Sequence, residues 1–205
     1  MPQPLPLEPC TLDPLTSVTF AGYSFDVPWA VADSTELGAQ RDVLRVDFAS
    51  GQVMAVSDLD ELLRALEGLR KEDAQTREYI ETMWGPQALE SHYGFIRVVM
   101  ETTPSDVTIF VHPMRAFGTK KLLTLKDELA SNAATGLYTF EAGDIRGFQL
   151  GDPSQATEVE VILFDPSDRA LNLLVRPGRD PAGRISQLDM SCILQSVRPA
   201  DEPHK

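Results

Sequence analysis

The sequence predicts an α+β protein, in which an antiparallel sheet built from N-terminal and C-terminal β-hairpins is combined with a central helical block and a C-terminal helix. Three observations favour this class. Near both ends of the chain, apolar residues alternate with the period of a β-strand. Between residues 57 and 132, apolar residues recur at helical spacing instead. Helical spacing of the apolar residues is found again after residue 185. Runs of strands followed by runs of helices are typical of α+β rather than alternating α/β folds.

The chain begins with a proline-rich segment. Prolines at positions 2, 4, 6, 9 and 14 predict an extended, weakly ordered arm over residues 1–16. A ligand for an aromatic groove is the alternative, but no basic residue flanks these prolines. We expect a single α+β domain over residues 17–198 and a disordered tail over 199–205.

Two hairpins are predicted at the start of the domain. Val18–Val27 has the pattern of a strand, a glycine turn and a second strand. Asp42–Ala49 and Gln52–Val56 flank Ser50-Gly51, which is a strong signal for a tight turn.

The helical block follows, over residues 57–132. Ser57–Asp60 resembles a capping box and predicts the start of the first helix. Further helices are expected over Asp73–Trp84 and Leu89–Glu101, separated by the helix-breaking pair Gly85-Pro86. The first helix is indicated by leucines at helical spacing, at positions 59, 62, 63, 66 and 69.

The end of the block contains two more predicted helices. Thr103–Asp106 combines a capping residue, a proline and an acid, and is a helix-start signal. Val107–Met114 continues at helical spacing, although its β-branched residues leave a strand as the alternative. Lys120–Leu129 is expected to be helical.

Two consecutive hairpins come next. Leu137–Ala142 pairs with Ile145–Leu150 across a Gly-Asp turn. The second hairpin is expected between residues 158–165 and 169–176, across a turn that contains proline and aspartate. Because Ile162 and Phe164 make its second face apolar, we expect a further layer of structure there.

The last predicted element is an amphipathic helix that begins near Ile185 and ends at Pro199. Its apolar residues make a stripe that the core should bury: Met190, Ile193, Leu194 and Val197.

This architecture resembles the family of Mog1/PsbP-like domains over Tyr23–Arg198. The resemblance rests on the strand segment Tyr23–Trp29 and on the closing helix Ile193–Arg198 after consecutive hairpins, and Phe148–Pro153 looks like a family signature. Members of the family serve as accessory, assembly and binding proteins without a shared active site. The resemblance therefore implies an architecture and no particular chemistry.

The net charge of the chain is −13, and no basic patch is present. We therefore expect neither nucleic acid nor an anionic membrane as a partner. Two cysteines are too few for a disulfide scaffold in a chain of 205 residues, so Cys192 is expected to be a small buried hydrophobe. No apolar run is long enough for a membrane span or a signal segment. The expected location is the cytoplasm, unless an export signal has been removed.

No catalytic, cofactor or metal motif is found. The glycines do not form a phosphate loop, and no serine nucleophile elbow is present. His92 and His112 lack metal-ligand spacing but could converge in a folded pocket, and His204 is in the tail. The carboxylates of Glu158 and Glu160 share a strand face, for which a sheet edge or a solvated face is the expected explanation.

The interpretation that follows is a non-enzymatic accessory module of bacterial type, which binds another protein and needs no cofactor. Trp84 and Tyr93 are the candidate binding residues, because a Gly-Pro break between helices can leave an aromatic ring exposed. Two alternatives remain: an enzyme with an unrecognised site between the sheet and the helical block, and an acidic, immunity-type inhibitor of a basic toxin.

Overall fold

A computed structural model describes most of the chain. For residues 38–40, 87 and 113–118 it describes the backbone alone. The described residues are all those outside 33–37, 41–42, 60–62, 65–73, 75–76, 79–80, 83–84, 107–112, 130–134, 156 and 201–205.

The largest element is an eight-stranded sheet with the strand order β1-β7-β8-β9-β10-β6-β5-β4. Every neighbouring pair is antiparallel except β1 and β7, which are parallel. The predicted α+β class and its hairpins are confirmed. The strands are β1 (Gln3–Pro4), β4 (Gly38–Gln40), β5 (Val43–Asp47), β6 (Val53–Asp58), β7 (Leu137–Ala142), β8 (Ile145–Leu150), β9 (Val159–Phe164) and β10 (Ala170–Arg176).

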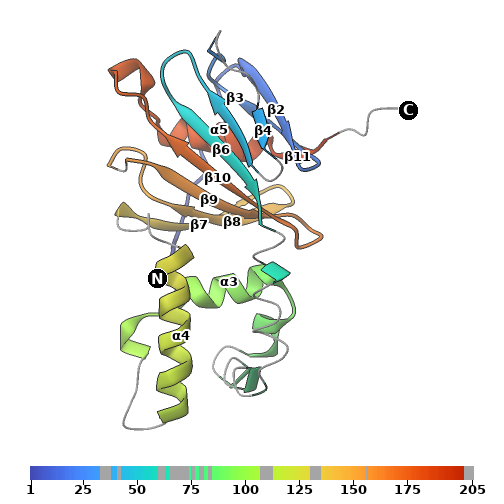
Figure 1. The fold of residues 1–205 in the computed structure, drawn as a ribbon, viewed down its shortest axis with the longest axis vertical. Helices are drawn as coiled ribbons and strands as arrows, with labels where there is room; N and C mark the ends of the chain where they lie inside the picture. Colours follow the sequence, from blue (N-terminus) through green and yellow to red (C-terminus); the bar gives the residue numbers. More distant parts are fainter. Residues whose placement is uncertain are drawn as a thin grey trace, which may run out of the picture.

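The first predicted hairpin lies in a separate sheet. Strands β2 (Thr16–Phe20) and β3 (Tyr23–Val27) pair with each other, and β11 (Arg198–Pro199) adds to β3. Helix α5 (Gln187–Ser196) packs against β3 and lies behind β6 and β10 of the large sheet in Figure 1. The first residue of the predicted tail, Pro199, is therefore part of a strand.

Two apolar clusters cover the two faces of the large sheet. Val161, Leu163 and Leu173 belong to the first cluster, which joins the sheet to α5 and the small sheet. Ile162 and Phe164 belong to the second cluster, on the side of the helices. The prediction that a further layer covers the second face of this hairpin is therefore confirmed.

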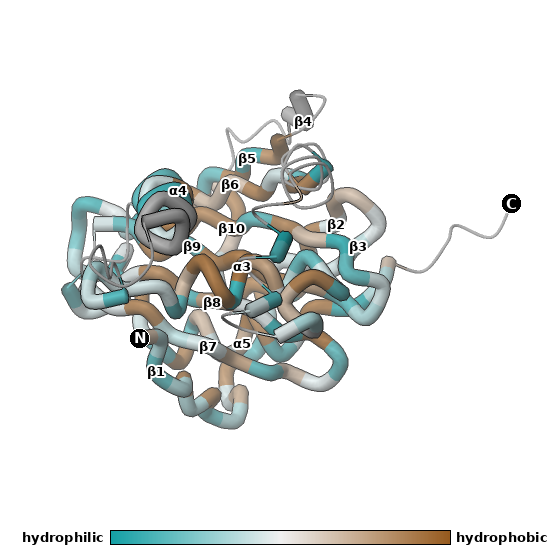
Figure 2. The backbone as a smooth tube through the Cα atoms, turned by 90° about the horizontal axis from the view of Figure 1, so that it is seen from below, coloured by the Kyte–Doolittle hydropathy of each residue, from teal (hydrophilic) through white to brown (hydrophobic). Residues whose placement is uncertain are grey.

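The helical layer contains α3 (His92–Glu101) and α4 (Pro113–Leu129), with short 3-10 helices at Pro86–Leu89 and Pro104–Asp106. Helix α3 lies beneath the sheet, and α4 projects away from it (Figure 1). Seen from below, the brown, apolar part of α3 lies over β8 and β9 (Figure 2). The described apolar face of α3 therefore rests on the middle strands of the sheet.

The end of α3 is tied to α4 by a lysine. Lys126 Nζ donates hydrogen bonds to the carbonyl oxygens of Met100 (2.6 Å) and Thr102 (2.8 Å). Partial burial lowers the pKa of the Lys126 ammonium. The ammonium satisfies carbonyls that a helix leaves unpaired at its C-terminus.

The predicted capping box at Ser57 is not a helix start. Ser57 and Asp58 are the last residues of β6 and pair with Asn172 and Leu171 of β10. The chain turns helical only afterwards, where Leu63 N donates to Leu59 O at 2.8 Å. Pairing across the sheet outweighs the local capping signal, because it satisfies the same backbone groups in a longer ladder.

Other predicted helices fall partly outside the described residues. Of Asp73–Trp84, the described residues 74, 77–78 and 81–82 are helical. Of Val107–Met114, residues 107–112 lie outside the described part of the chain. The predicted helix Lys120–Leu129 is confirmed and begins earlier, at Pro113.

The N-terminal arm is extended, as predicted, but it lies against the domain. The amide of Leu5 donates to Thr139 O at 2.7 Å, and Gln195 Nε2 donates to Glu8 O at 2.6 Å. The side chains of Leu5 and Leu7 pack against the first cluster. The arm therefore has hydrogen-bond partners on two elements, the edge strand β7 and helix α5.

Candidate functional site

The N-terminus of α3 is held by the turn between β9 and β10. The carboxylate of Asp168 accepts hydrogen bonds from the amides of His92 and Tyr93, the latter at 3.1 Å. Ser91 is the N-cap and accepts from Gly94 N at 2.9 Å. Asp168 has a φ of +64°, a conformation that aspartate tolerates better than most residues. A negative charge at this position also suits the helix dipole.

His92 takes part in this anchor. Its Nδ1 lies 3.1 Å from Asp168 Oδ2, while its Nε2 is buried without a hydrogen-bond partner among the described residues. His112 lies outside the described residues, so the structure does not test whether the two histidines converge. The visible role of His92 is to connect α3 to the β9–β10 turn.

Tyr93 lies where α3 meets the sheet. Its ring stacks on Phe148 of β8 with centroids 5.5 Å apart, and meets the ring of Phe164 edge to face at the same distance. The guanidinium of Arg146 lies 4.1 Å from the centroid of the Tyr93 ring, in cation–π geometry. The side chain is partly buried, and burial raises the pKa of its hydroxyl.

A groove of about 530 Å³ runs along this part of α3. Tyr93 and Arg146 line it together with Arg97 and Glu101. Arg97 Nε donates to Glu101 Oε1 at 2.7 Å, and this bond raises the pKa of the guanidinium. The Arg97 side chain is nevertheless 56% exposed. The groove thus combines an aromatic wall with two guanidinium groups, and the carboxylates of Glu90 and Glu101 balance their charge.

Of the two predicted binding residues, only Tyr93 can be placed. Trp84 lies outside the described residues. The position of Tyr93 on a helix beside a Gly-Pro break could be inferred from the sequence. Its partner Arg146 could not, because that residue comes from β8, far along the chain.

The two strand carboxylates singled out in the sequence have ordinary partners. Glu158 accepts from Arg176 Nε at 2.6 Å, and Glu160 accepts from Asn172 Nδ2 at 3.0 Å. These contacts cross between β10 and the start of β9. Because β9 lies between β8 and β10, the carboxylates are not at a sheet edge, and both side chains are half-buried.

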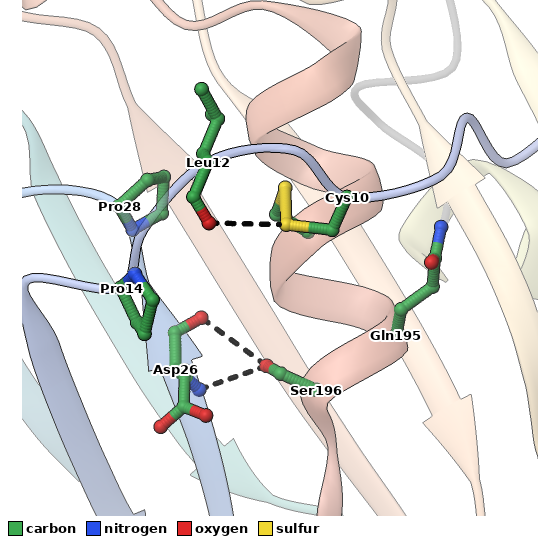
Figure 3. A pocket seen from close by; sticks show the side chains of 8 residues that line it. Cys10, Leu12, Pro14, Asp26, Pro28, Gln195 and Ser196 are labelled. Carbon is green, nitrogen blue, oxygen red and sulfur yellow. Dashed lines mark hydrogen bonds between the residues drawn. A yellow bond between two sulfur atoms is a disulfide. The ribbon is translucent and has the colours of Figure 1, made fainter.

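A second pocket, of about 280 Å³, lies between the N-terminal arm, β3 and α5 (Figure 3). Cys10 and Cys192 border it and form a disulfide that joins residues 182 positions apart. The expectation of Cys192 as a plain buried hydrophobe was therefore incomplete. An even number of cysteines was the available signal, but the pairing depends on where the arm lies, which periodicity does not reveal.

A third hollow, of about 870 Å³, lies among the loops before β9 and before α5. Arg179 and Arg184 border it, but so do Asp152 and Asp180, so the charges balance. The segment Phe148–Pro153 has a structural role here: the side-chain amide of its Gln149 exchanges two hydrogen bonds with that of Gln187 in α5, at 2.8 and 3.2 Å.

The described residues contain no group of three or more His, Cys, Asp or Glu side chains that could hold a metal ion. Among the helices that the structure describes, none is long and apolar enough to cross a membrane.

No protein-family model matches the chain. No curated protein matches it significantly either.

Proposed function

We propose that this protein is a non-enzymatic accessory module that binds another protein along α3. The observation that carries the proposal is the groove lined by Tyr93, Arg97, Glu101 and Arg146. Tyrosine and arginine are enriched among the residues that dominate protein–protein binding energy. Tyr93 is thus proposed to contact the partner, as the sequence predicts, and Arg97 and Arg146 are proposed to contact it as well.

The groove favours a partner segment with a carboxylate beside an apolar side chain. The partly buried ring of Tyr93 offers an apolar contact at the junction with the sheet. The exposed guanidinium of Arg97 can bind a carboxylate through two parallel hydrogen bonds. Such a segment would compete with Glu101 for Arg97, so binding should weaken as salt is added.

The disulfide favours an oxidising compartment over the cytoplasm that the sequence predicts. Cys10 and Cys192 are both paired, and stable disulfides are rare in reducing cytosol. The likeness to Mog1/PsbP-like domains stays a prediction, and an accessory binding role agrees with it.

The proposal is tested by site-specific crosslinking in the source cells. A photoreactive residue at Glu90, which lines the groove, is exposed and leaves Arg97 in place, should give one defined adduct, whereas the same residue at Thr19, exposed on β2, should not. The adduct at Glu90 should disappear in competition with wild-type protein and persist with the charge-reversed competitor Arg97→Glu. Identical adducts at both positions, or equal competition by the two proteins, would exclude the groove as the binding site.

A further inference from the structure

The N-terminal arm has the chemistry of a strand that bonds on one side only. In an extended chain the amides of successive residues point to opposite edges. The amide of Leu5 points to β7, where it donates to Thr139 O at 2.7 Å. Pro4 and Pro6 occupy the alternate positions, and proline has no amide hydrogen to donate. The outer edge of the arm therefore cannot extend the sheet, a common way to protect an edge strand.

The strand beneath the arm needs this protection. Without β1, the strand β7 would be the last of the sheet and would leave backbone groups unpaired. Its six residues are Leu-Tyr-Thr-Phe-Glu-Ala, with one charge and no proline. Such short segments of high β-propensity and low charge readily pair with another chain when they are exposed at an edge.

The contact between the arm and β7 is short, and a covalent bond holds the arm in place. β1 pairs with β7 at only Gln3 and Pro4. Cys10 then joins the arm to Cys192 in α5, as Figure 3 shows. Cys10 is exposed, whereas Cys192 is buried. The disulfide can therefore be attacked from solvent at the sulfur of Cys10.

We propose that the arm is a redox-latched cap of the sheet, and that its reduction allows β7 to pair with β7 of a second copy of this chain. A dithiol reductant supplies the electrons. Its thiolate attacks Cys10 Sγ, the S–S bond breaks and Cys192 leaves as a thiolate. The second thiol of the reductant then displaces Cys10, so that two cysteine thiols and one oxidised reductant result.

The sequence of β7 favours a second copy of this chain as the partner that pairs with its exposed edge. Antiparallel pairing of two identical strands gives a two-fold symmetric, closed interface. In a register that places Thr139 opposite Thr139, Glu141 lies opposite Leu137, so the two carboxylates stay apart. Side chains directly opposite each other share a face, so both apolar faces of the sheet would continue across the interface.

The first test compares oxidised and reduced protein by sedimentation velocity and amide hydrogen exchange. Reduction should produce a concentration-dependent dimer. Under dilute conditions that keep the protein monomeric, reduction should raise exchange at Thr139, whose backbone faces the arm, by roughly tenfold or more, and should affect Tyr138 and Phe140, which face β8, much less. Amides of residues 159–164 in β9 serve as the internal reference. A reduced protein that stays monomeric, with unchanged exchange in β7, would overturn the proposal.

Two pairs of variants keep the test decisive if reduction also destabilises the fold. With the disulfide intact, Leu5→Pro removes both the side chain and the amide donor, whereas Leu5→Ala removes only the side chain. Leu5→Pro should therefore expose β7 to exchange more than Leu5→Ala does, and equal exchange would argue against the cap. In reduced protein, Thr139→Lys should abolish the dimer while the control Thr19→Lys retains it. A dimer that survives Thr139→Lys is formed by another surface and refutes pairing through β7.

Discussion

The two layers that cover the large sheet are attached in different ways. On the side of α5, the small sheet and the arm are joined to the helix by side chains and by the disulfide. The hydroxyl of Ser196 accepts from Asp26 N at 2.8 Å, and Arg198 Nη1 lies 2.9 Å from Asp26 Oδ2. On the other side, α3 is anchored by Asp168 at one end and by Lys126 at the other.

This difference in attachment predicts that the two layers contribute unequally to the stability of the fold. The α5 layer closes over the first cluster and ties chain segments that are far apart in sequence, so its residues are explained by the fold. The α3 layer, as far as the structure describes it, leaves Arg97 and Arg146 in an accessible groove. Substitutions on the α5 side should therefore lower global stability, whereas substitutions around α3 should act more locally.

The largest expected effect is in the first cluster. Leu173→Ala should lower the free energy of unfolding by roughly 2–5 kcal/mol, because it leaves a cavity beneath α5. Leu173 is fully buried, while its neighbour Leu174 is only partly buried on the opposite face. Leu174→Ala is the matched control and should cost much less in urea unfolding. A loss below half a kcal/mol for Leu173→Ala would contradict the assignment of this hairpin to the core.

The disulfide should contribute the next largest effect. Cys10→Ser is expected to lower the free energy of unfolding by roughly 2–4 kcal/mol, because the bond restricts a very long loop in the unfolded chain. Chemical denaturation with and without reductant measures this. The difference between wild type and variant should vanish once the wild type is reduced, and a difference that persists would assign the loss to packing around Cys10.

The sequence predicted the strands well where pairing is local. The bounds of β7 and β8 are those predicted, because a period of two and a Gly-Asp turn determine them together. The two apolar faces of β9 also followed from its side-chain pattern. By contrast, Ser57 and Asp58 carried a helix signal and form strand, because their partners in β10 lie more than a hundred residues away.

The candidate site was predicted only in part, for the same reason. Tyr93 followed from aromatic residues beside a helix break, but the groove needs Arg146 from a distant strand. The position of the arm and the Cys10–Cys192 bond likewise depend on which strand forms the edge of the folded sheet. Contacts of this kind leave no periodic trace in a single sequence.

A smaller effect is expected from releasing α3. Asp168→Gly removes the carboxylate that caps α3, while glycine accepts the positive φ, so the cost should be about 1–2 kcal/mol. Amide exchange should increase in α3 and remain unchanged in α5. Ser186→Ala is the matched control, since Ser186 caps α5 and its loss should raise exchange there instead. Equal changes in both helices would mean that the two layers are not independent.

The smallest effect concerns acid stability on the α5 side. Hydrogen bonds from Arg198 and Ser17 hold the pKa of the Asp26 carboxyl below its usual value, although burial opposes them. Because the folded-state pKa is lower than the unfolded one, Asp26 stabilises the fold above about pH 4 and loses this contribution as the pH falls through the folded-state pKa. Arg198→Gln should raise the pKa of Asp26 in an NMR titration and reduce the loss of stability on acidification.

The exposed pair Arg45–Asp47 is the control: Arg45→Gln should shift the pKa of Asp47 but leave that of Asp26 unchanged. An Asp26 pKa that does not move in Arg198→Gln would show that the ion pair does not hold β3 to the segment after α5.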